Sequence, residues 1–593
     1  MAAQKKTSQK CKLNYTDRQL PPFCRDYQSK IAEKFEALSD LASEPDIDYE
    51  WSRFKETVYK AAEETVGPQT RENKSWISKE TCELIEQRRI AKRLRDEDNT
   101  DENKRKYREL DKSVKNSAEK DWKSWIDEQA KELEEASTKN NQRVVFKKVK
   151  TLTGNKTSST PLVKDKDGNI IGDEEKKLER WAEHFSVLLN AEPPVNAMED
   201  IPVEWDQLDV DLNDPTREEV IEAIKRLKNN KAPGYDDITA EMLKAGGDQL
   251  VDWLLRICIV VWQTERVPKD WKRGVIIKLP KKGDLTICSN NRGITLLSIA
   301  GKVFCILVLL RTRDATDERL RENQAGFRKG RSCIDQCFAL RQLIEKCLEF
   351  QILVNINFID FKAAFDSVDR ESLWKILEAY GFPKKIINIM KNTYDGLECC
   401  VKVDGKSTEW FPVSAGVRQG CVWSPLLFVI LIDWVLKQAL DKNDCGIVLE
   451  RRRSSRYQQQ RLSDLDFADD IALIDESEER LQYATTQVKE EGSKIGLSIN
   501  STKTKGMAVS KDKYNLTISL NNQDALENVK KFVYLGSMIT SDGDSSREIN
   551  NRIGKAANAF NKLLPIMRHS FHPASYKNGN LSGHCNYHPT IWS

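Results

Sequence analysis

The chain has 593 residues, of which 32% are charged and 39% hydrophobic, so it is long enough for several domains with sizeable cores. Its 95 Lys and Arg against 92 Asp and Glu give a formal net charge of only +3, which excludes a uniformly basic or acidic protein and leaves the local distribution of charge to decide about nucleic acid. The longest apolar run, 422–436, is too short and too interrupted to span a membrane.

The first ten residues are polar and basic, so we predict no signal peptide. The 14 cysteines contain no Cys-x-x-Cys pair, which favours free thiols in a reducing compartment. We therefore expect an intracellular protein of the cytoplasm and nucleus, without a membrane partner.

Residues 1–155 are predicted to form an all-helical, charge-rich region. From 91 to 135, Lys and Arg alternate with Asp and Glu, and Trp122 and Trp125 are sparse apolar anchors. This pattern favours a solvated helix or helical hairpin with ion pairs four residues apart. The alternative is a helical arm that lies along a nucleic-acid backbone. A coiled-coil scaffold is less favoured, because no apolar heptad is sustained.

Residues 156–214 are expected to contain linkers and a small helical segment. A hairpin is predicted over 161–171, where Gly168 supplies the glycine that its turn needs. A helix over 174–189 follows, and the acidic, proline-bearing stretch 192–214 reads as a second linker.

Residues 215–540 change in character, because strand-like runs now alternate with helical ones, which predicts an α+β fold. Helices are expected over 217–227, 370–379 and from Ser424-Pro425 onward, a typical helix start. The predicted strands are 274–279, 353–359, 398–403, 464–474, 515–520 and 529–535.

Residues 541–593 are predicted to begin with a helix over 545–564 and to end in a polar, aperiodic tail. Four of the five histidines, with Cys585 among them, lie in this tail. Their spacing superficially resembles zinc ligands. No strand or helix pattern would hold a tetrahedral site, so a disordered terminus is favoured.

The most informative motif is Phe467-Ala468-Asp469-Asp470, which lies between two short apolar stretches. Neighbouring carboxylates repel each other and lose hydration in a half-buried turn, unless a cation neutralises them. Mg²⁺ prefers carboxylate oxygens together with substrate phosphates. The alternative is an ordinary solvated turn, in which Asp is common.

A second acid favours the metal site. Asp360 directly follows the apolar strand predicted over 353–359, so it is well placed to share a metal with an acid from another strand. Two-metal phosphoryl transfer needs such a set of carboxylates, because one ion activates the attacking hydroxyl and the other stabilises the leaving group.

These residues resemble the reverse transcriptases of non-long-terminal-repeat (non-LTR) retrotransposons, and the resemblance covers roughly 215–540. It rests on ordered blocks rather than on one motif, and the sequence Pro-Lys-Lys-Gly-Asp at 280–284 is similar to the RTE-like and CR1-like branches. The blocks are Lys228–Asp236, Ile277–Asp284, Asn291–Ile294, Gln324–Arg328, Asp360–Asp366, Gly416–Cys421 with Ser424 and Pro425, Phe467–Asp470, Gly496–Asn500 with Lys503 and Thr504, and Tyr534–Gly536.

The resemblance implies the right-hand polymerase fold, with fingers and palm over 215–540, and an RNA-directed DNA polymerase that copies template RNA from a DNA primer with deoxynucleoside triphosphates. It implies that Asp360 and Asp469, with Asp470 beside them, bind two Mg²⁺ ions, with Mn²⁺ as an alternative.

The resemblance also implies a nucleotide-binding set. Phe365 would be the steric gate that excludes a 2′-hydroxyl, while Lys281, with Lys282 as an alternative, and Arg292 would bind the triphosphate. Gln419 and Gly420 would pack close to the nascent base pair, where a glycine lets the backbone approach the nucleotide. Lys503 would lie near the pyrophosphate as a general acid.

The chain departs from the family pattern in several places. Trp423 stands where a smaller aliphatic residue is usual, and Asn290-Asn291 replaces an aromatic residue before Arg292. The first 183 residues contain no histidine, so we expect no endonuclease of the apurinic type, and we expect a truncated thumb over 541–593. A catalytically defective remnant that only binds RNA is therefore the alternative function.

Overall fold

The structure is a computed structural model, and it describes residues 20–36, 46–66, 76–138, 144, 162–199, 201–202, 205–281, 283–441, 443–450, 460–510, 514, 516–521 and 524–568. The chain divides into two compact units. One comprises 1–12, 69–159 and 546–593, and the other 13–68 and 160–545. The predicted alternative phosphate residue Lys282, the linker at 154–160 and the tail histidines lie outside the described residues.

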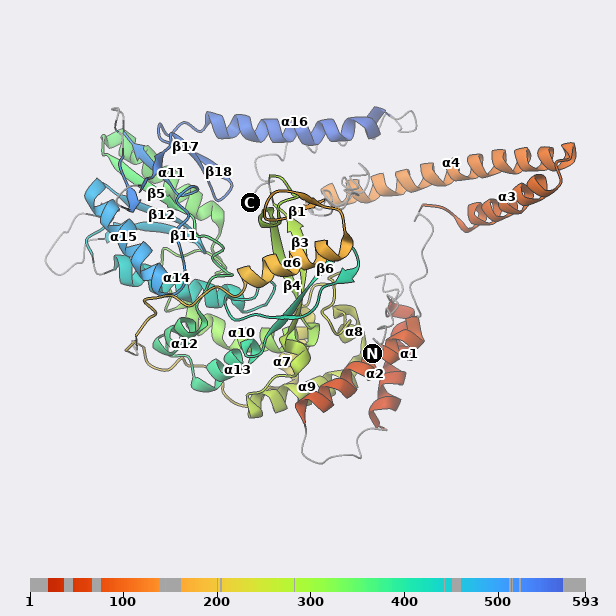
Figure 1. Cartoon of the computed structure of the whole chain (residues 1–593), viewed down its shortest axis with the longest axis horizontal. Helices are drawn as coiled ribbons and strands as arrows, with labels where there is room; N and C mark the ends of the chain where they lie inside the picture. Colours follow the sequence, from red (N-terminus) through yellow and green to blue (C-terminus); the bar gives the residue numbers. More distant parts are fainter. Residues whose placement is uncertain are drawn as a thin grey trace. The chain divides into compact units, whose positions relative to one another are not determined.

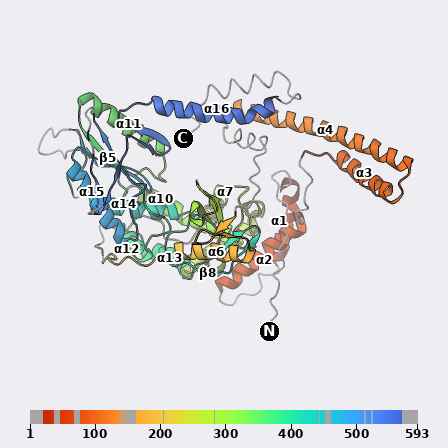
Figure 2. The ribbon, with the colours of Figure 1, turned by 45° about the horizontal axis from the view of Figure 1, so that its top comes forward.

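The first unit contains a helical hairpin, as the charge pattern predicted. Helix α3 (Lys79–Glu97) and helix α4 (Asp101–Thr138) run side by side (Figure 2). Three polar contacts hold them together at successive levels. They are Ser78 N to Asp121 Oδ2 (2.7 Å), Thr81 Oγ1 to Ser117 Oγ (2.5 Å) and Arg88 Nη1 to Asp111 Oδ1 (3.0 Å). Helix α16 (Ser546–Arg568), predicted over 545–564, also belongs to this unit.

The second unit begins with two helices that the charge-rich N-terminal pattern did not distinguish from the hairpin. Helices α1 (Leu20–Glu36) and α2 (Ile47–Val66) pack on α9 (Gly247–Thr264). The buried side chains of Trp51 and Phe54 make this contact, and the Phe54 ring meets Trp253 of α9 at 5.4 Å. Residues 20–66 therefore group with 160–545 rather than with the hairpin.

The first sheet of this unit has strands in the order β4-β3-β6-β7, with β8 also on β6. Strand β3 (Arg273–Pro280) pairs antiparallel with β4 (Asn291–Leu296) and parallel with β6 (Glu398–Val403). Strand β7 is Lys406–Ser407 and β8 is Phe411–Pro412. Helix α6 (Glu174–Leu188) lies against this sheet (Figure 1), with Trp181 and Phe185 fully buried.

The second sheet has the order β11-β12-β5-β13-β16. Strands β11 (Asp464–Phe467), β12 (Asp470–Asp475), β5 (Val354–Ile359) and β13 (Lys505–Val509) pair antiparallel, and β16 (Glu527–Asn528) adds in parallel. Every residue of β5 is buried, as expected for a central strand that is covered on both faces.

Each face of the second sheet belongs to a different core. Helices α14 (Ser424–Leu440) and α15 (Glu478–Lys494) cover one face, where Ile471 and Leu473 are buried. Helix α11 (Cys333–Phe350) and the hairpin of β17 (Lys531–Tyr534) and β18 (Ser537–Thr540) cover the other, where Ala472 and Ile474 are buried. This arrangement can be followed in Figure 1.

Local sequence explains where several helices begin. A capping box of Thr216 and Glu219 opens α7 (Arg217–Arg226), and Pro425 occupies the first turn of α14. The remaining elements are β1 (Val163–Lys164), β2 (Ile170–Ile171), α8 (Ala240–Ala245), α10 (Ile299–Asp317), α12 (Arg370–Ala379), α13 (Lys384–Tyr394), β9 (Ile447–Glu450), β10 (Gln460–Leu462), β14 (Ser519–Asn521), β15 (Asp524–Ala525) and the 3-10 turns Lys269–Lys272 and Cys288–Asn290.

The α+β class is confirmed, with sheets and helices intermixed throughout 160–545. The strand predicted over 515–520 was placed too early, because β14 begins only at Ser519. The hairpin at 161–171 is present as β1 and β2. Within the described part of the chain, no helix combines the length and hydropathy needed to cross a membrane.

Candidate active site

The two adjacent acids lie in a tight hairpin turn between β11 and β12, in which Phe467 pairs with Asp470. The turn residue Ala468 has a φ of 56°, in the left-handed region that is unfavourable for a residue with a side chain. Its N–H donates to Oε1 of the buried Gln324 at 2.9 Å, and the same oxygen accepts from Gly326 N at 2.7 Å. Gln324 therefore holds the turn between β11 and β12 in its unusual conformation.

The first acid reaches this turn through strand pairing. Ile471 of β12 lies opposite Ile359 of β5, so Asp360, the next residue, leaves the sheet beside Asp469 and Asp470. The 109 positions between Asp360 and Asp469 are thus bridged by one antiparallel pair, as the sequence motifs predicted.

A third segment supports Asp360. The backbone N–H of Asn500 donates to the carbonyl of Asp360 at 2.7 Å, and Asp360 N donates to Thr504 Oγ1 at 3.2 Å. Lys503, between these two residues, places its Nζ 3.2 Å from Asp360 Oδ2. The block at 496–504 therefore positions the acid and supplies a cation next to it.

These segments enclose one cavity with a volume of about 590 Å³. Eight of the nine site residues predicted from the sequence line it, and only Asp470 does not. The eight are Lys281, Arg292, Asp360, Phe365, Gln419, Gly420, Asp469 and Lys503. They come from strands, loops and turns of both sheets, so only the tertiary fold assembles them.

Asp470 lies on the other side of the turn. Because side chains alternate along a strand, Asp470 shares its face of β12 with Ala472 and Ile474, toward α11. Its pKa is raised to about 6 by loss of surrounding water and by the charges of Asp469 and Asp360. It is placed to act on the site through charge rather than from inside the cavity.

The charges of the cavity favour a cation at the acids. Burial and the neighbouring charge of Asp360 raise the pKa of Asp469, as expected for two carboxylates that lie close together. Among the described residues, no three His, Cys, Asp or Glu side chains are close enough to hold an ion by themselves. Two carboxylates that open onto a cavity nevertheless fit a divalent ion such as Mg²⁺, which usually takes one or two protein carboxylates and completes its shell with water and substrate.

The cationic wall of the cavity comes from the first sheet. Lys281 and Arg292 lie at the ends of β3 and β4, where Leu279 pairs with Arg292. Partial burial and the nearby charge of Arg292 lower the pKa of Lys281. Two cations held this close repel each other, which is relieved when an anion binds between them.

The floor of the cavity beside the acids is aromatic. Phe365 stacks on the buried Phe428 of α14, with ring centroids 4.2 Å apart and an interplanar angle of 18°. Phe327 meets Phe365 edge-on, with centroids 6.5 Å apart, and lies at the same distance from Phe467. Phe365 is thus fixed from below while one edge still faces the cavity.

The structure gives Gln419 and Gly420 contacts that the sequence did not reveal. The amide nitrogen of Gln419 lies 2.9 and 2.8 Å from the two carboxylate oxygens of Asp366. A Cβ on Gly420, whose φ is 121°, would come within 2.3 Å of the Thr295 carbonyl oxygen. The glycine is therefore required by a neighbouring strand of the protein itself.

Sequence reasoning missed three residues of this site. His184 of α6 lines the cavity, and burial with the charges of Arg180 and Lys281 lowers its pKa to about 4, so it is neutral at physiological pH. His184 is the one histidine of the chain outside the tail, and this position could have identified it as a candidate site residue. The other two are Gln324 and Phe327, which belong to a recognised block but received no role.

Phe327 combines an exposed side chain with a strained backbone. Its side chain is 56% exposed, although it lies on the cavity wall, and its φ is 57°. A left-handed conformation costs a bulky residue about 1–3 kcal/mol and persists only where the surroundings impose it. Arg328 imposes it by donating to Asp317 and to the carbonyls of Arg321 and Gln324.

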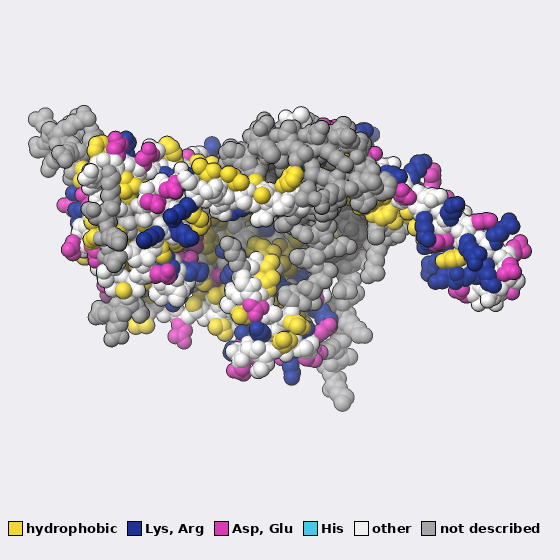
Figure 3. All heavy atoms as spheres, turned by 90° about the horizontal axis from the view of Figure 1, so that it is seen from above, with side chains coloured by type: hydrophobic (Ala, Val, Ile, Leu, Met, Phe, Trp, Pro, Cys, Tyr) yellow, Lys and Arg dark blue, Asp and Glu magenta, His cyan; other side chains and the backbone are white. Residues whose placement is uncertain are grey.

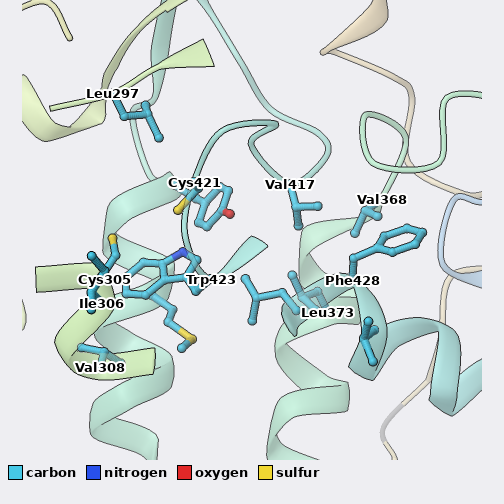
Figure 4. Close-up of a cluster of buried hydrophobic side chains, with 14 of the residues drawn as sticks. Leu297, Cys305, Ile306, Val308, Val368, Leu373, Val417, Cys421, Trp423 and Phe428 are labelled. Carbon is cyan, nitrogen blue, oxygen red and sulfur yellow. The ribbon is translucent and has the colours of Figure 1, made fainter. Parts of the chain in front are cut away.

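The unusual Trp423 is a buried packing residue. Its ring lies in the cluster beneath the 416–421 loop, with Cys305, Ile306 and Val308 from α10 (Figure 4). Val417 and Phe428 belong to the same cluster. The large indole therefore supports the loop that carries Gln419 and does not enter the cavity.

Comparison with known proteins gives a consistent result for the core of the chain. Residues 279–539 match a family model described as "Reverse transcriptase (RNA-dependent DNA polymerase)". The chain is 29% identical over 330 residues to the "Transposon TX1 uncharacterized 149 kDa protein" of Xenopus laevis, covering 54% of this chain and 24% of that protein. It is 31% identical over 216 residues to the "Probable RNA-directed DNA polymerase from transposon BS" of Drosophila melanogaster, covering 36% and 24%.

The chain thus spans about a quarter of the length of these relatives. Among solved structures, an apo telomerase from Candida tropicalis truncated from its C-terminal domain aligns with 46% of this chain and 54% of that chain, at 15% identity and a TM-score of 0.33. At these values the likeness supports no conclusion about the fold.

Proposed function

We propose that this chain is an RNA-directed DNA polymerase of the non-LTR retrotransposon type, because residues 279–539 match a family model of reverse transcriptases. The observation that carries the proposal is the cavity in which Asp360 and Asp469 face Lys281 and Arg292. Carboxylates on one side and fixed cations on the other suit a deoxynucleoside triphosphate with its metal ions.

This function assigns parts of a right-hand polymerase to the two sheets. We assign the sheet of β5, β11 and β12 to the palm, because it carries both acids, and the sheet of β3 and β4 to the fingers, because it carries both cations. The expected boundary at 540 fits this assignment, and α16 would then begin the thumb. Helix α6 precedes the expected boundary at 215 but packs on the fingers sheet, so the fingers would include it.

Asp360 and Asp469 would hold the divalent ions, which supply activation of the primer 3′-hydroxyl and stabilisation of the departing pyrophosphate. The protein's own task is to keep both carboxylates ionised and correctly placed. Gln324 fixes the turn of Asp469, and the backbone of Asn500 fixes Asp360. We retain Asp470 as a neighbour whose charge strengthens the field at the site.

Lys281 and Arg292 would bind the triphosphate, since guanidinium can contact phosphate in a bidentate manner and ammonium acts as a point charge. Lys503 occupies the metal side of the cavity and is paired with Asp360. Its side chain is 66% exposed, so it can leave this acid for the pyrophosphate and donate a proton there.

Phe365 would stack under the incoming sugar and exclude a 2′-hydroxyl. Phe428 supports this role by stacking on the opposite face, so that the ring cannot retreat. Phe327 extends the same aromatic edge toward the turn of the acids. We propose that Phe327 contacts the terminal base pair of the primer and template, because base and sugar faces stack favourably on aromatic rings.

Two finer assignments follow from the sequence. The Pro-Lys-Lys-Gly-Asp block at 280–284 favours an RTE-like or CR1-like branch. The twelve cysteines in the described residues are free thiols, which fits work inside the cell, in the cytoplasm and nucleus, where template RNA, primer DNA and nucleotides are available.

Primer extension on an RNA template with Mg²⁺ tests the function. The intact chain should extend the primer, and Asp469→Asn should reduce the rate by at least 100-fold while RNA binding persists. Equal extension by both proteins would refute the enzyme, and RNA binding without synthesis by either would favour the remnant that only binds RNA.

A further inference from the structure

The near-neutral charge of the α3–α4 hairpin conceals a strong gradient along its length. Residues 88–115, which form the tip, contain eleven Lys and Arg against seven Asp and Glu. Residues 116–138, which form the root of α4, contain three Lys and Arg against seven Asp and Glu. The whole hairpin therefore appears balanced in composition, although its tip is basic and its root is acidic.

The basic side chains of the tip gather on one flank. On α4, Lys104, Arg108, Lys112 and Lys115 follow each other at three- and four-residue spacing, so they form one stripe. On α3, Arg88 and Lys92 are four residues apart.

Asp111 joins these two stripes. Its carboxylate accepts from Arg88 Nη1 of α3 at 3.0 Å and lies 2.7 Å from Lys115 Nζ of α4. Both stripes therefore lie on the same side of the hairpin. The space-filling view shows dark-blue side chains crowded over the tip of the hairpin (Figure 3).

Several of these cations are not used within the protein. Lys92, Arg93, Arg108 and Lys112 are exposed and, among the described residues, have no acid within ion-pair distance. Like charges on neighbouring turns repel each other, so such a surface lowers the stability of the helices by a few tenths of a kcal/mol per pair. Binding of an anion relieves this repulsion and therefore lowers the free energy.

Contacts between α3 and α4 fix the two helices that carry these charges. Arg95 lies over the ring of Tyr107 at 4.4 Å, and the Asn103 amide caps the turn by donating to Asp98 O at 2.9 Å. Ala91 and Val114 are buried between the helices. The positions of the cations are thus set before any ligand arrives, which reduces the ordering cost of binding.

We propose that the basic tip of the α3–α4 hairpin binds the phosphate backbone of RNA. A row of cations along a rigid rod matches a continuous polyanion better than it matches a single phosphate or one acidic side chain. RNA is the polyanion that the proposed function brings to this protein, so this identification rests on that function. Contacts of this type are independent of sequence and depend steeply on salt.

The alternatives predict different behaviour. A merely solvated face would bind nothing, and a membrane-binding helix would need a broad apolar face beside its cations. The tip exposes only scattered apolar residues, Ile90 and Leu94, at 50% and 44% exposure. This is too little for a lipid surface, and it leaves nucleic acid as the favoured ligand.

The test measures binding of a fluorescent single-stranded RNA to the full chain between 50 and 200 mM salt. The tip variant carries Lys92→Gln, Arg108→Gln and Lys112→Gln. Three lost phosphate contacts should make the slope of log affinity against log salt shallower by about 2, and weaken binding by about 100-fold near 0.1 M salt.

The matched control removes the same charge from the acidic root, with Lys120→Gln, Lys123→Gln and Lys131→Gln, and should bind RNA within threefold of the wild type. Circular dichroism should show equal helicity for both variants. The proposal would be overturned if the tip and root variants weakened RNA binding equally, or if the tip variant kept the RNA affinity of the wild type. It would also be overturned if the tip variant lost binding only to anionic phosphatidylserine vesicles. An equal loss on single-stranded DNA supports the backbone contact, whereas a loss on DNA alone overturns RNA as the ligand.

The proposed polymerase function can fail separately. If the wild type extends no primer but binds RNA, and the tip variant binds RNA more weakly, the polymerase proposal fails and the binding surface stands. If extension on a short, saturating primer-template is normal while the tip variant binds RNA like the wild type, the binding surface fails and the polymerase stands.

Discussion

Replacing Gln324 by Leu tests whether a residue outside the cavity sets the geometry of the catalytic turn. The Gln324 side chain is fully buried, and its Oε1 accepts from Ala468 N at 2.9 Å and from Gly326 N at 2.7 Å. Leu has a similar size and no acceptor. The variant therefore leaves two buried N–H groups without a partner while disturbing the packing little.

The magnitude follows from these contacts. Each buried donor that loses its acceptor costs about 1–3 kcal/mol. Loss of Gln324 Nε2, which is buried and has no partner among the described residues, offsets part of this cost, so the net destabilisation is about 1–4 kcal/mol. Because Ala468 is held at a φ of 56°, we expect the turn to relax first and to displace Asp469.

The assay is single-nucleotide extension with saturating deoxynucleoside triphosphate, combined with thermal unfolding. If about 2 kcal/mol is needed to restore the active turn, kcat falls about 30-fold, while the nucleotide KM changes less than threefold. Gln482→Leu is the matched control on α15, since the Gln482 amide also binds backbone: its oxygen accepts from Ser519 N at 2.7 Å and its nitrogen donates to Ser519 O at 2.8 Å.

The two variants separate positioning from stability. Gln482→Leu should lower the unfolding temperature by a similar amount and leave kcat within threefold of the wild type. If Gln324→Leu keeps its kcat, or if both variants lose it equally, the turn does not depend on Gln324 and the reasoning is refuted.

Three further predictions concern the cavity. Phe365→Val should raise ribonucleotide incorporation at least tenfold relative to deoxyribonucleotide, and unchanged sugar selectivity in competitive extension would contradict the gate. Phe327→Ala should raise the KM for primer-template several-fold. The control Phe338→Ala, at a position on α11 with 63% exposure, should leave this KM unchanged. Equal effects of the two variants in steady-state extension would show that Phe327 does not contact the primer-template. Burial raises the pKa of Asp366 to about 6 in the folded protein, so its contribution to stability is complete below its unfolded value near 3.8 and is lost as pH rises to 6. Without divalent ions, Asp366→Asn should therefore match the wild type near pH 4 and exceed it by up to about 3 kcal/mol above pH 6, and a pH-independent difference in urea unfolding would show that the buried carboxyl does not titrate.

Much of the local structure could be predicted from the residue pattern alone. It predicted β6 over 398–403 and α12 over 370–379 with the boundaries that the structure has, because both segments carry a clear period and clear end signals. It also identified Asp360 and Asp469 as partners, since an acid at a strand end and an acid in a turn are costly alone and useful together.

Which groups share the cavity depends on how the chain packs and could not be predicted from local patterns. Asp470 seemed equivalent to Asp469 in the sequence, but the strand alternation turns it toward the opposite core of the sheet. His184 enters from α6, far outside the recognised blocks. Gln324 reaches the turn across 144 positions, and no local pattern records such a contact.

The physical reason is the range of the interactions. Helix and strand periods, caps and turn residues act within a few positions, so a single sequence reveals them. Three features arise only when distant segments pack against each other. They are the hydrogen bond from Gln419 to Asp366, the steric clash that any side chain at position 420 would make, and the left-handed backbone of Phe327. The sequence therefore specified the acids and the elements that carry them, and the packing of the two sheets decided how they face the cavity.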